Sequence, residues 1–125
     1  MGYVEVAPTY VDGKIKHPCK RQYIDALTEM AKQGKAHRYF GIYFSGCTMW
    51  QSGDWAIQED DGSLSIICLK DVLEAIKTAD YKGYIWCSLD GPASGKWVTE
   101  MSRQIKNYKQ TLTNVLIDSC TDEHG

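Results

Sequence analysis

Residues Leu69–Gly91 read LKDVLEAIKTADYKGYIWCSLDG, and this stretch contains two different hydrophobic patterns. In Leu69–Thr78 the apolar residues recur every three or four positions, which predicts an amphipathic helix with one buried face. In Gly83–Leu89 a continuous apolar run leads to Asp90-Gly91, which predicts a buried strand followed by a turn. A helix that leads into a buried strand is typical of a parallel α/β sheet.

The same alternation continues on both sides of this stretch. Helical periods predict two more helices, at Lys20–Gln33, which Gly34 is suited to end, and at Trp97–Tyr108. Residues 8–19 are ambiguous apart from a turn at Asp12-Gly13. Strands are expected at Tyr3–Ala7, Tyr39–Phe44, Trp55–Gln58, Ser63–Ile66 and Thr113–Ile117.

We therefore expect one α/β domain over residues 1–125. Residues 1–19 would form an N-terminal strand and loop, and residues 20–125 the core. Strands that alternate with helices predict a three-layer architecture, a mostly parallel sheet with helices on both faces. In such sheets binding and catalytic sites form at the carboxyl ends of the strands, so Ser45–Trp50, Asp90–Trp97 and Asp118–Glu123 become the candidate segments.

Composition excludes several classes of protein. A net charge of −2 argues against duplex nucleic acid as a partner, and no apolar run approaches the roughly 18 residues of a membrane span. The start of the chain lacks a signal-peptide pattern, and five widely spaced cysteines predict reduced thiols in a cytoplasmic protein.

Asp90–Trp97 departs from the phosphate-binding loop pattern, and His17 and Cys19 have no second pair at zinc spacing. We expect neither cofactor nor metal.

Charge is distributed unevenly along the chain. Residues 12–38 carry seven Lys and Arg against three acidic residues, whereas residues 54–80 carry seven acidic residues against two lysines. Such segments either form two solvated faces of opposite sign or make a self-complementary surface that drives association of copies.

The strand ends resemble motifs of the caspase-like cysteine peptidases, the group of caspases, metacaspases and paracaspases. Tyr43–Thr48, YFSGCT, resembles the Tyr-x-Ser-Gly-His-Gly segment of that family. Ile85–Trp97, IWCSLDGPASGKW, is similar to its strand ending in Asp-x-Cys-Tyr-Ser-Gly, and Val115–Glu123 is similar to the strand that follows. The resemblance covers about residues 20–124 and implies a shortened, caspase-like form of the three-layer fold.

The departures from the family pattern fall on the residues that carry its chemistry. Cys47 stands where the family has its general-base histidine, and Pro92 stands where it has its nucleophilic cysteine. Thr48 replaces the glycine of the oxyanion hole. Proline offers neither a nucleophile nor a backbone N–H, and a thiol is a poor substitute for imidazole, which titrates near neutrality. The resemblance therefore implies a catalytically inactive pseudo-peptidase.

The function expected from this reasoning is a protein–protein interaction or structural module. Family domains are longer and have more strands, so a shortened sheet would leave an edge that a protein partner or a second copy closes by β-pairing. Neither nucleic acid nor a membrane is an expected partner. The candidate binding residues are Ser45, Gly46, Thr48, Asp90, Ser94, Gly95 and Trp97.

Two other interpretations remain open. An active cysteine hydrolase could use a displaced nucleophile, either Cys120, because Asp118-Ser119-Cys120 resembles Asp-x-Cys, or Cys47. Such an enzyme needs a general base within reach of the thiol. Alternatively, the chain is an unrelated small α/β domain.

Overall fold

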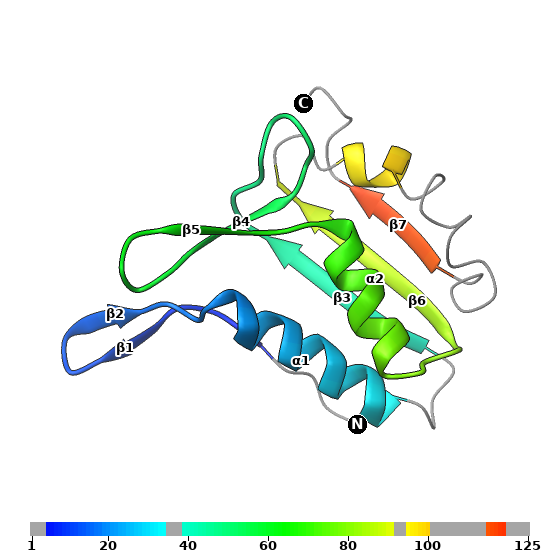
Figure 1. Ribbon diagram of the computed structural model, residues 1–125, viewed down its shortest axis with the longest axis horizontal. Coiled ribbons are helices and arrows are strands. Elements are labelled where there is room, and N and C mark those ends of the chain that lie inside the picture. The colour runs from blue at the N-terminus through cyan, green and yellow to red at the C-terminus, as the bar shows by residue number, and fades with distance from the viewer. Residues whose placement is uncertain (1–4, 35–38, 92–94, 101–114, 120–125) are drawn as a thin grey trace.

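A parallel sheet of three strands lies at the centre of the molecule, in the order β3-β6-β7 (Figure 1). The structure is a computed structural model that describes residues 5–34, 39–91, 95–100 and 115–119. The strands are β3 (Tyr39–Ser45), β6 (Tyr84–Asp90) and β7 (Val115–Ser119). This arrangement confirms the predicted mixed α/β class with a parallel sheet.

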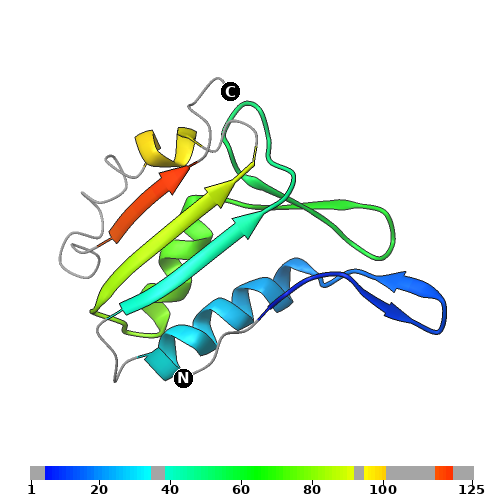
Figure 2. The ribbon, with the colours of Figure 1, turned by 180° about the vertical axis from the view of Figure 1, so that it is seen from behind.

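Two helices cover one face of this sheet, α1 (Lys20–Gln33) and α2 (Leu69–Thr78), with the predicted bounds. Figure 2 shows the sheet from the other side, with no described helix in front of β3 and β6. Residues 95–100 are also helical, and Trp97 within them joins the same core as α2. Within the described residues, therefore, the helices occupy a single face, and the expected second helical layer is not among them.

The core forms between this face and the helices because successive side chains of a strand point to opposite sides. Phe40 and Ile42 of β3, and Ile85, Cys87 and Leu89 of β6, are at most 9% exposed. The face of α2 against them contains five buried residues, Leu69, Val72, Leu73, Ala75 and Ile76. Helix α1 has only one fully buried residue, Ala31, and packs partly buried apolar residues against the core.

Two hairpins project from the same side of the molecule (Figure 1). One consists of β1 (Thr9–Val11) and β2 (Lys14–Lys16), and the other of β4 (Trp55–Gln58) and β5 (Leu64–Ile67). The predicted turn at Asp12-Gly13 joins β1 to β2, with φ values of 51° and 76°. Positive φ at both central residues matches the right-handed twist of a tight hairpin.

The structure corrects some sequence-based boundaries. Glu5–Ala7 lie outside any strand, because apolar alternation without a neighbouring ladder does not fix a strand, and the rest of the predicted strand Tyr3–Ala7 lies outside the described residues. Gly34 ends α1 in the right-handed region, with φ of −76°. β6 extends to Asp90. In the described part of the chain no helix has both the length and the apolar character needed to cross a membrane.

Candidate functional site

The carboxyl ends of β3 and β6 lie side by side, as the parallel register requires. Ser45 pairs with Asp90, and the Ser45 hydroxyl donates to Asp90 Oδ2 over 3.4 Å. The Tyr43 hydroxyl donates to the same oxygen, also over 3.4 Å. The structure thus brings together two of the predicted candidates, Ser45 and Asp90, and adds Tyr43, which sequence analysis did not single out as a site residue.

The loops that follow these strands approach each other closely. The Gly46 amide donates to the Asp90 carbonyl over 3.1 Å. A methyl group on Gly91 would lie 2.8 Å from the Gly46 carbonyl oxygen and 2.8 Å from Thr48 Cγ2, closer than carbon atoms pack. The predicted candidates Gly46 and Thr48 therefore occupy the space between the strand ends, and position 91 accepts only glycine without rearrangement.

Cys47 lies at this edge with its side chain exposed, and its carbonyl accepts a hydrogen bond of 3.0 Å from the Ala56 amide. The only imidazole among the described residues belongs to His17, which lines a cavity beside the β1–β2 hairpin. General-base activation of a thiol needs a base within hydrogen-bond reach. The described residues offer Cys47 no imidazole for this purpose.

The remaining predicted site residues are either buried or lie outside the described residues. Trp97 is 1% exposed, so it is a core residue and offers no surface to a partner. Gly95 is buried at the start of the helical segment 95–100. Pro92, Ser94 and Cys120 lie outside the described residues.

Trp97 belongs to a stack of three aromatic rings beneath the carboxyl edge. Its ring lies 4.9 Å from that of Trp55, which in turn lies 4.2 Å from the ring of Phe44, centroid to centroid. The indole N–H of Trp97 donates to Asp54 Oδ1 over 3.0 Å. This stack fixes the first turn of the last described helix against the β4–β5 hairpin, which is a structural role.

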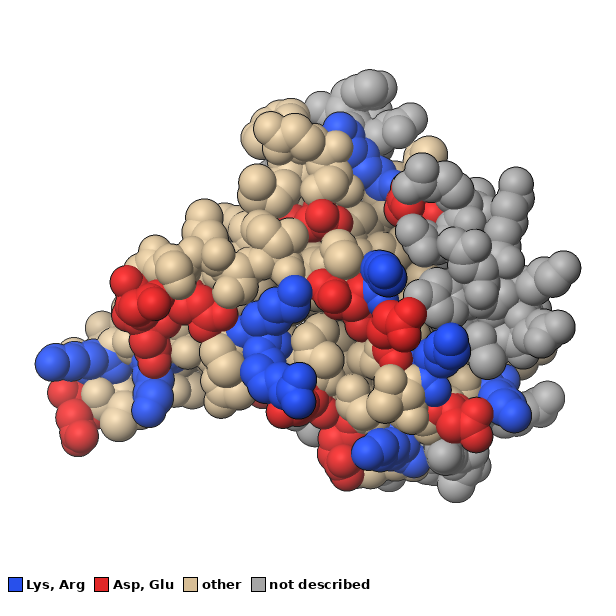
Figure 3. Space-filling model, in the orientation of Figure 1, with Lys and Arg blue, Asp and Glu red and all other residues tan. Residues whose placement is uncertain are grey.

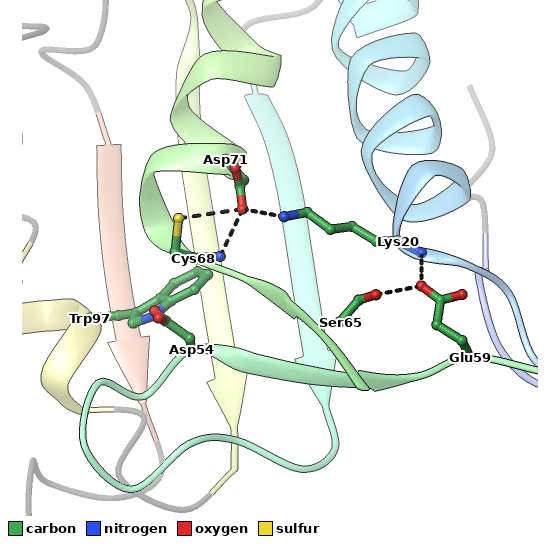
Figure 4. A network of polar contacts seen from close by, with 7 residues as sticks. All are labelled: Lys20, Asp54, Glu59, Ser65, Cys68, Asp71 and Trp97. Carbon is green, nitrogen blue, oxygen red and sulfur yellow. Dashed lines mark hydrogen bonds and ion pairs between the residues drawn. The ribbon is translucent and has the colours of Figure 1, made fainter. Parts of the chain in front are cut away.

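A polar network joins the beginnings of α1 and α2 (Figure 4). Lys20 Nζ lies 3.0 Å from Asp71 Oδ2, and the Cys68 amide and thiol both donate to that oxygen, over 3.0 and 3.3 Å. Burial raises the pKa of Asp71, but the hydrogen bonds from Cys68 and Lys20 outweigh it, so the pKa lies below its usual value. Burial, reinforced by the Asp71 carboxylate, raises the pKa of the Cys68 thiol. Cys68 lies at the N-cap of α2, and its thiol contact with Asp71 belongs to the network that joins the two helices.

An open cavity of about 1040 Å³ lies between the β1–β2 hairpin, the start of α1 and the β4–β5 hairpin. The His17 amide donates to Asp60 over 2.6 Å, and the Lys20 amide donates to Glu59 over 3.1 Å. Five acidic residues line the cavity: Glu5, Asp25, Glu59, Asp60 and Asp61. Sequence analysis missed this cavity because its walls come from segments more than thirty residues apart.

The sheet face opposite α1 and α2, here called the outer face, carries exposed aromatic side chains. Tyr43 of β3 is 70% exposed, and Tyr84 and Trp86 of β6 are 49% and 57% exposed. Gly41 lies beside Trp86 in the parallel register, and the space above it is open. The outer face is thus an aromatic surface with open space above Gly41.

Comparison with protein-family models, curated proteins and solved structures finds no significant match to this chain. The described residues contain no group of three or more His, Cys, Asp or Glu side chains arranged to hold a metal ion.

Proposed function

We propose that this chain is a non-catalytic protein-binding module of shortened caspase-like design, in which a protein partner on the outer face supplies the third layer. Parallel sheets are normally covered on both faces, because their strands are apolar on both sides. The single observation that carries the proposal is Trp86, which is 57% exposed on β6, the middle strand of the sheet. A large aromatic residue in that place is typical of a surface that another molecule covers.

The neighbours of Trp86 support this use. Tyrosine and tryptophan are enriched where binding energy is concentrated in protein interfaces, and Tyr43 and Tyr84 flank Trp86 on the same face. Because the space above Gly41 is open, an incoming side chain could lie beside the indole ring of Trp86.

The edge of the sheet offers a second point of attachment. β3 ends the strand order, and its sequence YFGIYFS contains no charged residue and no proline, the two features that usually discourage pairing at an edge. A partner that lies on the outer face could extend over β3 and add a strand to it.

Two observations support a non-catalytic role in a reducing, cytoplasmic setting. Cys47 has no imidazole near it among the described residues, and the family resemblance places Pro92 where a nucleophile would be needed. All four described cysteines, Cys19, Cys47, Cys68 and Cys87, are free thiols.

Affinity capture from the native source, read by mass spectrometry, tests the outer face with three baits: wild type, Trp86→Ala and Trp50→Ala. Trp50 is the matched control because it is equally exposed, at 62%, but lies outside the sheet. We expect a protein that wild type and Trp50→Ala retain and that Trp86→Ala binds at least about tenfold less well. Equal recovery of every protein by the three baits would contradict the proposal.

A second candidate function, a thiol hydrolase that uses Cys47, is favoured by the exposure of that thiol at the carboxyl edge. Labelling with covalent peptidyl probes, read by mass spectrometry, separates the two functions. The binding module predicts that these probes leave Cys47 unmodified. Stoichiometric labelling at Cys47, lost in Cys47→Ser, would establish the hydrolase instead.

A further inference from the structure

The β1–β2 hairpin, here called the arm, extends from the body with every strand residue exposed. Its large apolar residues Tyr10, Val11 and Ile15 are 75%, 48% and 53% exposed. An isolated two-stranded hairpin is at best marginally stable in water. The arm therefore lacks the packing that would hold it in place, although its turn at Asp12-Gly13 is well formed.

The arm has two chemically different faces. Tyr10 pairs with Ile15, so these two side chains share one face and make it apolar. Val11 pairs with Lys14 and Thr9 with Lys16, which makes the opposite face basic. Val11, which is 48% exposed, lies on the basic face, so a surface that binds this face should offer acidic groups and an apolar group.

The tip of the β4–β5 hairpin offers both kinds of group. Its turn, Glu59–Ser63, contains the carboxylates of Glu59, Asp60 and Asp61, and the next residue, Leu64, is 64% exposed. We call residues 59–64 the acidic tip. Figure 3 shows basic and acidic side chains gathered at the end of the molecule where the two hairpins project.

Among the described residues, no ion pair neutralises the charges of these two hairpins. One oxygen of each tip carboxylate accepts a hydrogen bond from a backbone amide or a hydroxyl, as Asp60 does from His17. The ion pairs found in the described residues involve neither Lys14 and Lys16 of the arm nor the carboxylates of the tip. Lys16 lines the same cavity as the tip without pairing to it.

We propose that two copies of this chain associate by exchanging arms, so that the arm of each copy lies against the acidic tip of the other. The basic face of the arm would then contact the tip, with Lys14 and Lys16 facing the tip carboxylates and Val11, on the same face, covering Leu64. Because the arm and the tip project together, a two-fold axis satisfies both contacts at once and closes the assembly as a dimer. This interface is separate from the outer face and is independent of the partner proposed for it.

Reversing the charges of the arm or of the tip tests the proposed exchange of arms. Sedimentation velocity or light scattering of the wild-type chain at micromolar concentration should show a dimer whose dissociation constant rises with salt. The variants Lys14→Glu/Lys16→Glu and Asp60→Lys/Asp61→Lys should each raise that constant at least about tenfold. An equimolar mixture of the two variants should restore the dimer, because each arm then meets a tip of opposite sign.

Two further variants control for folding and for charge in general. Asp60→Asn/Asp61→Asn retains oxygens that can accept the bonds from His17 and Ser63 and removes only the charge, so it should weaken the dimer without lowering the melting temperature. Lys32→Glu/Lys82→Glu reverses two exposed charges elsewhere and should leave the dimer intact. A monomeric wild-type chain, a dimer that survives both arm and tip reversal, or a mixture that stays monomeric would each overturn the proposal.

Discussion

The two faces of the central sheet are built from alternate residues of the same strands, yet they have opposite surroundings. Ile85 is 2% exposed beneath the helices, whereas its neighbour Trp86 is 57% exposed on the outer face. Burying an isoleucine side chain contributes roughly 1.5 to 3 kcal/mol, so the inner face supplies the stability of the sheet. Trp86 on the outer face buries less of its surface and therefore contributes less to folding.

Replacing Ile85 or Trp86 with alanine should give the largest difference in stability between the two faces. Ile85→Ala should lower the free energy of unfolding by about 2 to 5 kcal/mol, because it leaves a cavity in the core. Trp86→Ala should lower it by less than about 1 kcal/mol, although it removes the larger side chain. Urea unfolding followed by circular dichroism measures both. Comparable losses would mean that the outer face is buried in the folded protein.

A pair of glycines gives the next largest effect. Gly91→Ala should cost about 1 to 3 kcal/mol, because the new methyl group would meet the Gly46 carbonyl at 2.8 Å. Gly41→Ala is the matched control on the open face, where a methyl group meets nothing within 4 Å, and it should be neutral or stabilising by up to about 1 kcal/mol. Thermal unfolding of the two variants compares them directly, and equal shifts would show that the strand ends can separate.

The smallest effect concerns the ion pair that links the two covering helices. Because the pKa of Asp71 is lowered in the folded protein, its stabilising contribution is present above the unfolded value of about 3.9 and is lost as pH falls through the folded value. Wild type should therefore lose more stability between pH 5 and 2 than Asp71→Asn, by about 0.5 kcal/mol, since the pair is about a third exposed.

Asp25→Asn provides the control for the acid titration, because it removes another helical carboxylate, one that is paired only on the surface with Arg21. If wild type and Asp71→Asn lose the same free energy of unfolding between pH 5 and 2, the Lys20–Asp71 pair does not hold the helices together.

The sequence was most informative where a single periodic pattern controls the structure. The bounds of α1 and α2 follow from their apolar faces, and β4 begins and ends at the predicted residues. Residues Glu5–Ala7 have the composition of a strand but not its partner, and strand pairing depends on residues distant in sequence. Residues 8–19 were ambiguous for a different reason, since both strands of the arm are exposed and therefore carry no pattern of buried residues.

Sequence analysis located only the part of the candidate site that follows from the topology of the sheet. Parallel topology brings Ser45 and Asp90 together, so strand-end reasoning located the carboxyl edge. The same reasoning could not reveal that the side chain of Trp97 stacks on Trp55, nor that the tip carboxylates line a cavity with the arm. These features depend on packing between segments far apart in the chain, which a local pattern does not contain.

The aromatic stack beneath the carboxyl edge also gives the molecule a built-in optical reporter. Of its four tryptophans, Trp55 and Trp97 are 3% and 1% exposed, whereas Trp50 and Trp86 are 62% and 57% exposed. Acrylamide should therefore quench the fluorescence of only the second pair. A ligand that covers the sheet would shift the emission of Trp86 to shorter wavelength while the buried pair stays unchanged, so occupancy and unfolding give separate signals in one spectrum.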